Sequence, residues 1–209
     1  MSDPGMIEGQ RGIARIEAFS DGVIAIIITI MVLELKVPLA EGLEHLWQIW
    51  PVFIAYALSY VYVAIYWVNH HRLFSHARKA GNALIWANIS LLFALSLIPF
   101  STSYLGEHHF SQDAALLYLA TLLLPSVTYT WLQRTIRISG DRSANAAAYH
   151  DATTRKGYAA TAIYLAGFML SFVSPWLGIA CAALVATFWI LPWGPLDRLF
   201  LRCDPPVGL

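Results

Sequence analysis

The stretch RIEAFSDGVIAIIITIMVLELKVP, residues 15–38, decides the fold of this protein. Its central part, Val23–Leu33, carries no charged residue, and Thr29 is the only polar side chain there. A helix that crosses the hydrocarbon core of a bilayer needs roughly 20 mostly apolar residues. The sequence therefore predicts a membrane-spanning helix over about residues 13–37.

The rest of the chain has the same apolar character. Of its 209 residues, 58% are hydrophobic and 12% are charged, and its mean hydropathy is +0.58. Because soluble domains are about 25% charged, this composition excludes a typical soluble enzyme, a coiled coil and a disordered chain. We expect an all-α membrane protein, a single transmembrane domain over residues 1–209, with six spans. They lie at about residues 13–37, 46–71, 83–105, 114–132, 158–173 and 176–193.

The basic residues predict the orientation of these spans. Of the 13 Lys and Arg residues, all except Lys36 fall on one side of the predicted helices. Cytoplasmic loops are enriched in Lys and Arg, so we expect both termini in the cytoplasm. An odd number of spans would break this alternation, which supports six spans over five or seven. The longest connection, residues 142–150, is expected to be a cytoplasmic loop.

A helical wheel at about 100° per residue divides the first span into two faces. One arc holds the small and polar residues, namely Gly22, Ala25, Ile26, Thr29, Ile30 and Leu33. The other arc is bulky and apolar, namely Ile24, Ile27, Ile28, Met31 and Leu35. The first arc suits close packing of helices. It also suits a pore axis, where Ile26, Ile30 and Leu33 would form apolar rings that gate by dewetting. The residues alone leave both interpretations open.

Asp21 lies inside this apolar stretch. A carboxylate near the centre of a span costs roughly 2.5–3.5 kcal/mol, so a polar partner is expected. The second span ends at the same depth with the polar run of residues 67–71. We therefore predict a polar cluster of Arg15, Ser20 and Asp21 with Trp67, Asn69, His70 or His71. The alternative is a set of interfacial residues solvated by lipid headgroups.

Two motifs resemble a known family. The run Arg15-xxx-Phe19-Ser20-Asp21-Gly22-Val23-x-Ala25-Ile26-xx-Thr29 is similar to the first-helix signature of the transmembrane protein 175 family. The run Trp67-xx-His70-His71-xx-Phe74 is similar to the same family. These proteins are endolysosomal potassium channels and their bacterial relatives. The resemblance implies a bacterial single-repeat member in the inner membrane. It also implies a homotetramer in which the first helix of each subunit lines a central pore.

The resemblance also implies roles for single residues. Ile26 would form the narrowest ring, continued by Ile30 and Leu33. Thr29 would form a hydroxyl layer that affects selectivity. A bracing network would hold the pore helix, formed by Arg15, Phe19, Ser20, Asp21, Trp67, Asn69, His70 and His71. The implied function is a potassium-permeable channel with moderate selectivity over sodium, and the permeation of protons stays open.

Other classes of function fit the sequence less well. A proton-coupled secondary transporter with Asp21 and the histidines as a relay is the alternative, but internal repeats and broken helices, which are typical of transporters, are not found. Adjacent histidines on a helix point about 100° apart, so we expect no metal site and no cofactor. The sequence has no Walker motif, nucleophile elbow or glycine-rich phosphate loop, which argues against an enzyme. A net charge of zero argues against nucleic acid as a partner.

Overall fold

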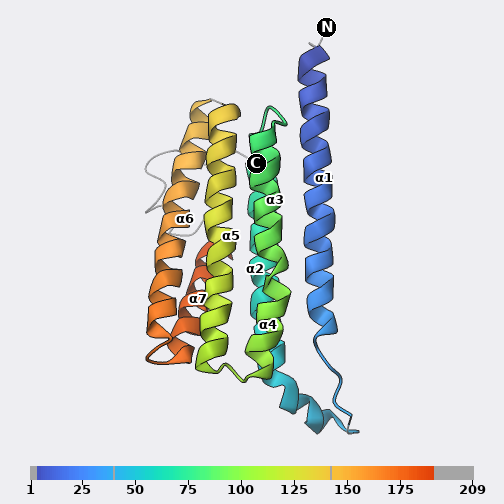
Figure 1. Ribbon diagram of the computed structural model, residues 1–209, viewed down its shortest axis with the longest axis vertical. Coiled ribbons are helices and arrows are strands. Elements are labelled where there is room, and N and C mark those ends of the chain that lie inside the picture. The colour runs from blue at the N-terminus through green and yellow to red at the C-terminus, as the bar shows by residue number, and fades with distance from the viewer. Residues whose placement is uncertain (1–3, 40, 142, 191–209) are drawn as a thin grey trace.

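The computed structural model describes residues 4–39, 41–141 and 143–190, and these form helices and their connections without a strand. The helices run up and down in turn along the long axis of the molecule (Figure 1). Their bounds are α1 Pro4–Leu33, η1 Leu43–Ile49, α2 Trp50–Phe74, α3 Asn82–Ser96, α4 Ile98–Glu107, α5 Gln112–Ser139, α6 Ala144–Leu170 and α7 Pro175–Ile190. Helices α3 and α4 follow one another as a single crossing, so the expected six-helix, all-α architecture is confirmed.

Within the described residues, four segments are long and apolar enough to cross a membrane. They are Gly9–Leu33, Leu43–Phe74, Asn82–Glu107 and Gln112–Ser139. Helix α7 is a shorter apolar helix, and α6 carries charged residues in its first half. The last residues of the sixth predicted span, 191–193, lie outside the described residues, as do the two basic residues predicted to follow it.

Two helix boundaries differ from the prediction because of proline. The third span is divided at Leu97, and Pro99 occupies the first turn of α4, where its missing N–H costs nothing. Residues 46–49 belong to the short 3-10 helix η1, and α2 begins only at Trp50, with Pro51 in its first turn. The second predicted span therefore begins as a 3-10 helix and continues as the α-helix α2.

The predicted loop over residues 142–150 is wrong. Helix α6 begins at Ala144, so the connection from α5 is only Gly140–Ser143. The Ser143 hydroxyl accepts a hydrogen bond from the Ala146 N–H at 3.2 Å, which is the usual N-cap arrangement. The alanines that follow have the highest helix propensity of any residue. A polar but alanine-rich segment behind a serine cap forms a helix rather than a loop.

Helix α1 lies at the edge of the bundle (Figure 1). Helix α5 packs against α2, α3, α4, α6 and α7, whereas the main neighbours of α1 are α2, α3 and α4. The side of α1 that faces these helices is apolar, with Ile24, Ile27 and Met31 buried. The residues on the opposite side of α1 are exposed, and this arrangement positions the candidate site.

Candidate pore helix and its supporting contacts

The uncovered side of α1 coincides with the small and polar arc of the helical wheel. All six members of that arc are exposed, namely Gly22, Ala25, Ile26, Thr29, Ile30 and Leu33. Ile26 is 58% exposed and Leu33 is 76% exposed, whereas Ile24 and Met31 on the other arc are each 1% exposed. Within one subunit, this face of α1 therefore remains unpaired. It is the face for which the sequence predicts either helix packing or a pore.

A groove of about 610 Å³ follows one edge of this face, between α1 and the α3–α4 crossing. Its walls are Val23, Ile26, Ile27, Ile30 and Glu34 from α1, with Ser96, Pro99, Phe100 and Ser103 opposite. At one end of the groove the Ser103 hydroxyl donates to the Glu34 carboxylate at 3.0 Å. Just beyond, Lys36 pairs with Glu107 at 2.7 Å. These two contacts fix one end of α1 to α4.

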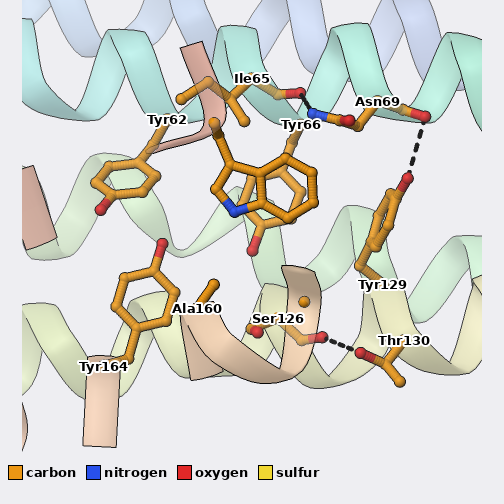
Figure 2. A pocket seen from close by; sticks show the side chains of 11 residues that line it. Tyr62, Ile65, Tyr66, Asn69, Ser126, Tyr129, Thr130, Ala160 and Tyr164 are labelled. Atoms are coloured by element: carbon orange, nitrogen blue, oxygen red, sulfur yellow. Dashed lines mark hydrogen bonds between the residues drawn. The ribbon is translucent and has the colours of Figure 1, made fainter. Parts of the chain in front are cut away.

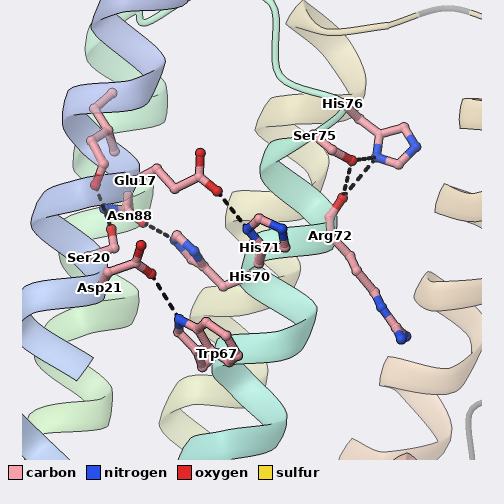
Figure 3. A network of polar contacts seen from close by, with 11 residues as sticks. Glu17, Ser20, Asp21, Trp67, His70, His71, Arg72, Ser75, His76 and Asn88 are labelled. Atoms are coloured by element: carbon pink, nitrogen blue, oxygen red, sulfur yellow. Dashed lines mark hydrogen bonds and ion pairs between the residues drawn. The ribbon is translucent and has the colours of Figure 1, made fainter. Parts of the chain in front are cut away.

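The other half of α1 is fixed to α2 by two parallel contacts (Figure 3). The Trp67 indole Nε1 donates to Asp21 Oδ1 at 2.9 Å. The His71 Nδ1 donates to Glu17 Oε1 at the same distance of 2.9 Å. Glu17 and Asp21 are four residues apart, as are Trp67 and His71, so each pair occupies one face of its helix. Antiparallel packing then brings the two pairs into register.

A buried chain of hydrogen bonds connects three helices behind these contacts (Figure 3). The Asn88 Nδ2 on α3 donates to the Ser20 hydroxyl on α1 at 2.9 Å, and the Ser20 hydroxyl donates to the Ile16 carbonyl at 2.8 Å. The Asn88 Oδ1 lies 2.8 Å from His70 Nε2 on α2. With its amide nitrogen used by Ser20, Asn88 accepts at its oxygen, so we assign the proton to His70 Nε2. All three side chains are buried.

The structure brings together some of the predicted bracing residues and leaves others apart. Ser20, Asp21, Trp67, His70 and His71 take part in the contacts above. Asn69 instead donates to the Ile65 carbonyl of its own helix at 2.8 Å. Phe19 and Arg15 are exposed, and among the described residues Arg15 has no hydrogen bond or ion pair.

Two residues of the network were not predicted. Glu17 binds His71 and Asn88 joins Ser20 to His70. The spacing of Glu17, one helical turn before Asp21, was a signal for the first of these. Asn88 is a lone amide in the apolar third span, which was a weaker signal because its partners depend on how three helices pack. The sequence leaves open which histidine pairs with α1. His71 does so directly through Glu17, whereas His70 is connected to α1 only through Asn88 on α3.

A second cavity lies inside the subunit, between α2, α5, α6 and α7 (Figure 2). Its volume is about 30 Å³, room for about one or two water molecules. Tyrosine rings form much of its wall, and the Tyr129 hydroxyl beside it donates to the Asn69 carbonyl at 3.1 Å. No residue of α1 lines this cavity. Its small size does not suit a path for ions.

The described residues contain no group of three or more His, Cys, Asp or Glu side chains that could hold a metal ion. His70 and His71 are adjacent but point to different helices, His70 to α3 and His71 to α1. His108 packs on the Tyr104 ring at 3.9 Å between ring centres. The rings of His70 and His71 are therefore not arranged to bind one ion together.

Comparison with known proteins places these features in a family. The family model described as "Endosomal/lysosomal potassium channel TMEM175" matches residues 15–99. A potassium channel of Chryseobacterium sp. (strain P1-3) is 44% identical over 179 residues, covering 85% of this chain and 92% of the relative. A potassium channel of Chamaesiphon minutus is 35% identical over 188 residues, covering 85% and 93%.

Vertebrate relatives match over a shorter region. The mouse endosomal/lysosomal proton channel TMEM175 is 35% identical over 97 residues, which is 41% of this chain and 19% of the mouse protein. The crystal structure of a lysosomal potassium-selective channel TMEM175 homolog from Chamaesiphon minutus superposes with a TM-score of 0.76 at 33% identity. That match covers 86% of this chain and 96% of the other. The chain is therefore a membrane protein of the TMEM175 family, a family of ion channels and not of enzymes.

Proposed function

We propose that this chain forms a homotetrameric, potassium-permeable channel in the bacterial inner membrane, with α1 of each subunit lining the central pore. The observation that carries the proposal is the uncovered arc of α1, because all six of its members are exposed. The bacterial relatives are named potassium channels, which supports the choice of ion. The side that bears most Lys and Arg residues would be cytoplasmic, with both termini there.

The composition of the arc suits a shared axis between copies of α1. Exposed positions on other helices include large apolar side chains such as Phe93 and Val127 and also alanines such as Ala162 and Ala183. The arc of α1 includes Gly22 and Ala25, which let neighbouring helices approach closely but offer lipid little surface. Four copies of α1 that meet along this arc would place Ile26, Ile30 and Leu33 around the axis as an apolar constriction.

Thr29 would supply the polar element of this neck. Its hydroxyl donates to the Ile26 carbonyl at 3.0 Å, which uses the hydroxyl proton. The lone pairs of the oxygen then stay available as acceptors for a cation. Four such hydroxyls between apolar rings would replace part of the hydration shell of a permeating cation. A filter built of carbonyl rings replaces most of that shell. Potassium releases its water more readily than sodium does, so we expect moderate selectivity for potassium.

The test is ion flux from liposomes that hold the purified protein, under a potassium gradient and then a sodium gradient. Ile26→Asn should raise the potassium flux strongly, because an amide wets the apolar constriction and lowers the barrier to ions. Val127→Asn is the matched control, since Val127 is a β-branched residue that is 61% exposed on α5 and lies away from the proposed axis.

Three results would contradict the proposal in different ways. Flux that responds equally to both substitutions would move the pore away from the arc of α1. Flux that saturates and depends on a proton gradient would favour the proton-coupled transporter. A folded protein that passes neither ion when residue 26 is Asn would rule out an apolar neck as the barrier.

A further inference from the structure

A cluster of three rings joins the segment after α2 to the start of α6. The His76 ring stacks on the Tyr149 ring, with 4.6 Å between ring centres and 7° between planes. The His150 ring stands edge-on to His76 at 5.5 Å. We call His76, Tyr149 and His150 the ring cluster. It lies on the side that bears most of the basic residues, and His150 precedes the predicted membrane span of α6.

His150 has the environment of a buried group without a partner. It is 1% exposed, and both of its ring nitrogens lack a hydrogen-bond partner within the described part of the chain. The Tyr149 hydroxyl beside it is in the same state. Buried polar side chains are nearly always paired, so packing alone does not account for an imidazole at this position. Leucine would fill a similar volume without an unmet donor or acceptor.

The charges around His150 oppose its protonation. His76 faces it from the segment after α2, Arg137 from α5 and Asp151 from α6, where Asp151 is paired with Arg137 at 2.7 Å. Arg72 of α2 acts on the neighbouring Tyr149. Burial lowers the pKa of His150 below its usual value, and His76 and Arg137 lower it further, against a smaller opposite effect of Asp151. Neutral His150 therefore belongs to the packed state.

The ring cluster lies where three elements interlock. The Asp141 N–H in the α5–α6 turn donates to the His76 carbonyl at 2.9 Å, and the Asp141 carboxylate pairs with Arg78 at 3.1 Å. The Gln133 amide on α5 donates to the His150 carbonyl at 3.0 Å. Helix α2, which ends just before His76, carries the residues that bind Asp21 and Glu17 of α1. A displacement at the ring cluster would therefore act on the end of α2, one to two turns from the residues that bind α1.

We propose that the ring cluster is a regulatory proton site: a proton taken up by His150 on the cytoplasmic side separates the start of α6 from the segment after α2 and lowers channel flux. The effect on flux rests on the proposed function, whereas the separation of the two elements does not. The acid form is disfavoured in the packed state, so the stability of this junction falls as the pH drops below the ordinary pKa of histidine.

The test compares wild type with His150→Leu, with the same pH on both sides of the membrane. We expect the thermal unfolding midpoint of the wild type to fall more than that of His150→Leu between about pH 7.5 and about pH 5.5. Wild-type potassium flux should fall about fivefold over the same range, and His150→Leu should keep most of it. His45→Leu is the control, because His45 binds Gln48 and lies at the other end of the bundle.

A second variant guards against loss of folding in the first. His76→Phe keeps an aromatic ring against Tyr149 but removes the titratable group that faces His150, so it should weaken the acid effect without abolishing it. Equal acid responses of wild type, His150→Leu and His76→Phe in the unfolding midpoint would overturn the proposal. A different result is also informative. If no flux is seen at any pH but the unfolding midpoint of wild type still falls more in acid than that of His150→Leu, the proposed channel function is contradicted and the proton site is supported.

Discussion

Asn88 shows how a single amide can hold three helices. Its two polar atoms bind Ser20 on α1 and His70 on α2, and all three side chains are buried. Hydrogen bonds of this kind add little net stability while they are made. Leaving a buried partner without its bond costs about 1–3 kcal/mol. The contribution of Asn88 to the stability of the fold is therefore best measured by replacing it.

Asn88→Leu should destabilise the folded protein by about 2 kcal/mol, because the His70 Nε2–H is left buried without an acceptor. Asn69→Leu is the matched control, since the Asn69 side chain binds only the Ile65 carbonyl of its own helix. The measurement is the midpoint of thermal or denaturant unfolding in a mild detergent. Equal losses in the two variants would mean that the contacts between helices at Asn88 contribute nothing beyond burial.

At the scale of the element, α6 contains a glycine, Gly157, beside which there is unoccupied space. Gly157 lines the tyrosine-walled cavity, and a methyl group added there would meet no atom within 4 Å. Glycine inside a helix is roughly 0.5–1 kcal/mol less favourable than alanine. Gly157→Ala should therefore raise the free energy of unfolding by about that amount.

Gly106 in α4 provides the contrast to Gly157. A methyl group there would lie 2.6 Å from the Val52 Cα, so α2 and α4 approach at this point as only glycine allows. Gly106→Ala should lower the unfolding midpoint under the conditions in which Gly157→Ala raises it. A rise for both variants would show that α2 and α4 move apart without cost.

The elements also show what the sequence could predict. The length and apolar content of each segment determine an all-α membrane fold, and the 3.6-residue period of α1 separates its buried side from its uncovered arc. The loop predicted over residues 142–150 is a helix from Ala144 because the Ser143 cap and the alanines behind it outweigh the polarity of the segment. Glu17 and Asn88 were missed because a polar contact between helices depends on the register of their packing, which no single helix encodes.

At the scale of the whole molecule, α1 is held at its middle and just beyond its last residue, and the arc between these points is uncovered. Trp67 and His71 bind Asp21 and Glu17 in the middle of α1, and Ser103 and Glu107 bind Glu34 and Lys36 after its end. A helix held in this way keeps the orientation of its arc, which is what a subunit that shares a pore with its copies requires. Helix pairs pack with their axes about 8–10 Å apart, so side chains on a shared axis would lie within reach of a short cross-linker.

Leu33→Cys, in a background without Cys181 and Cys203, should therefore be joined between subunits by a short bis-maleimide in the membrane. Leu33 is 76% exposed on the arc, and Val127 is 61% exposed on α5, so the thiol of Val127→Cys is also accessible, but this variant should remain monomeric on a denaturing gel. A ladder that ends at four for Leu33→Cys would count the copies around the axis. Monomer alone at residue 33, or the same ladder at residue 127, would mean that α1 faces lipid and that the conducting path is formed by another surface.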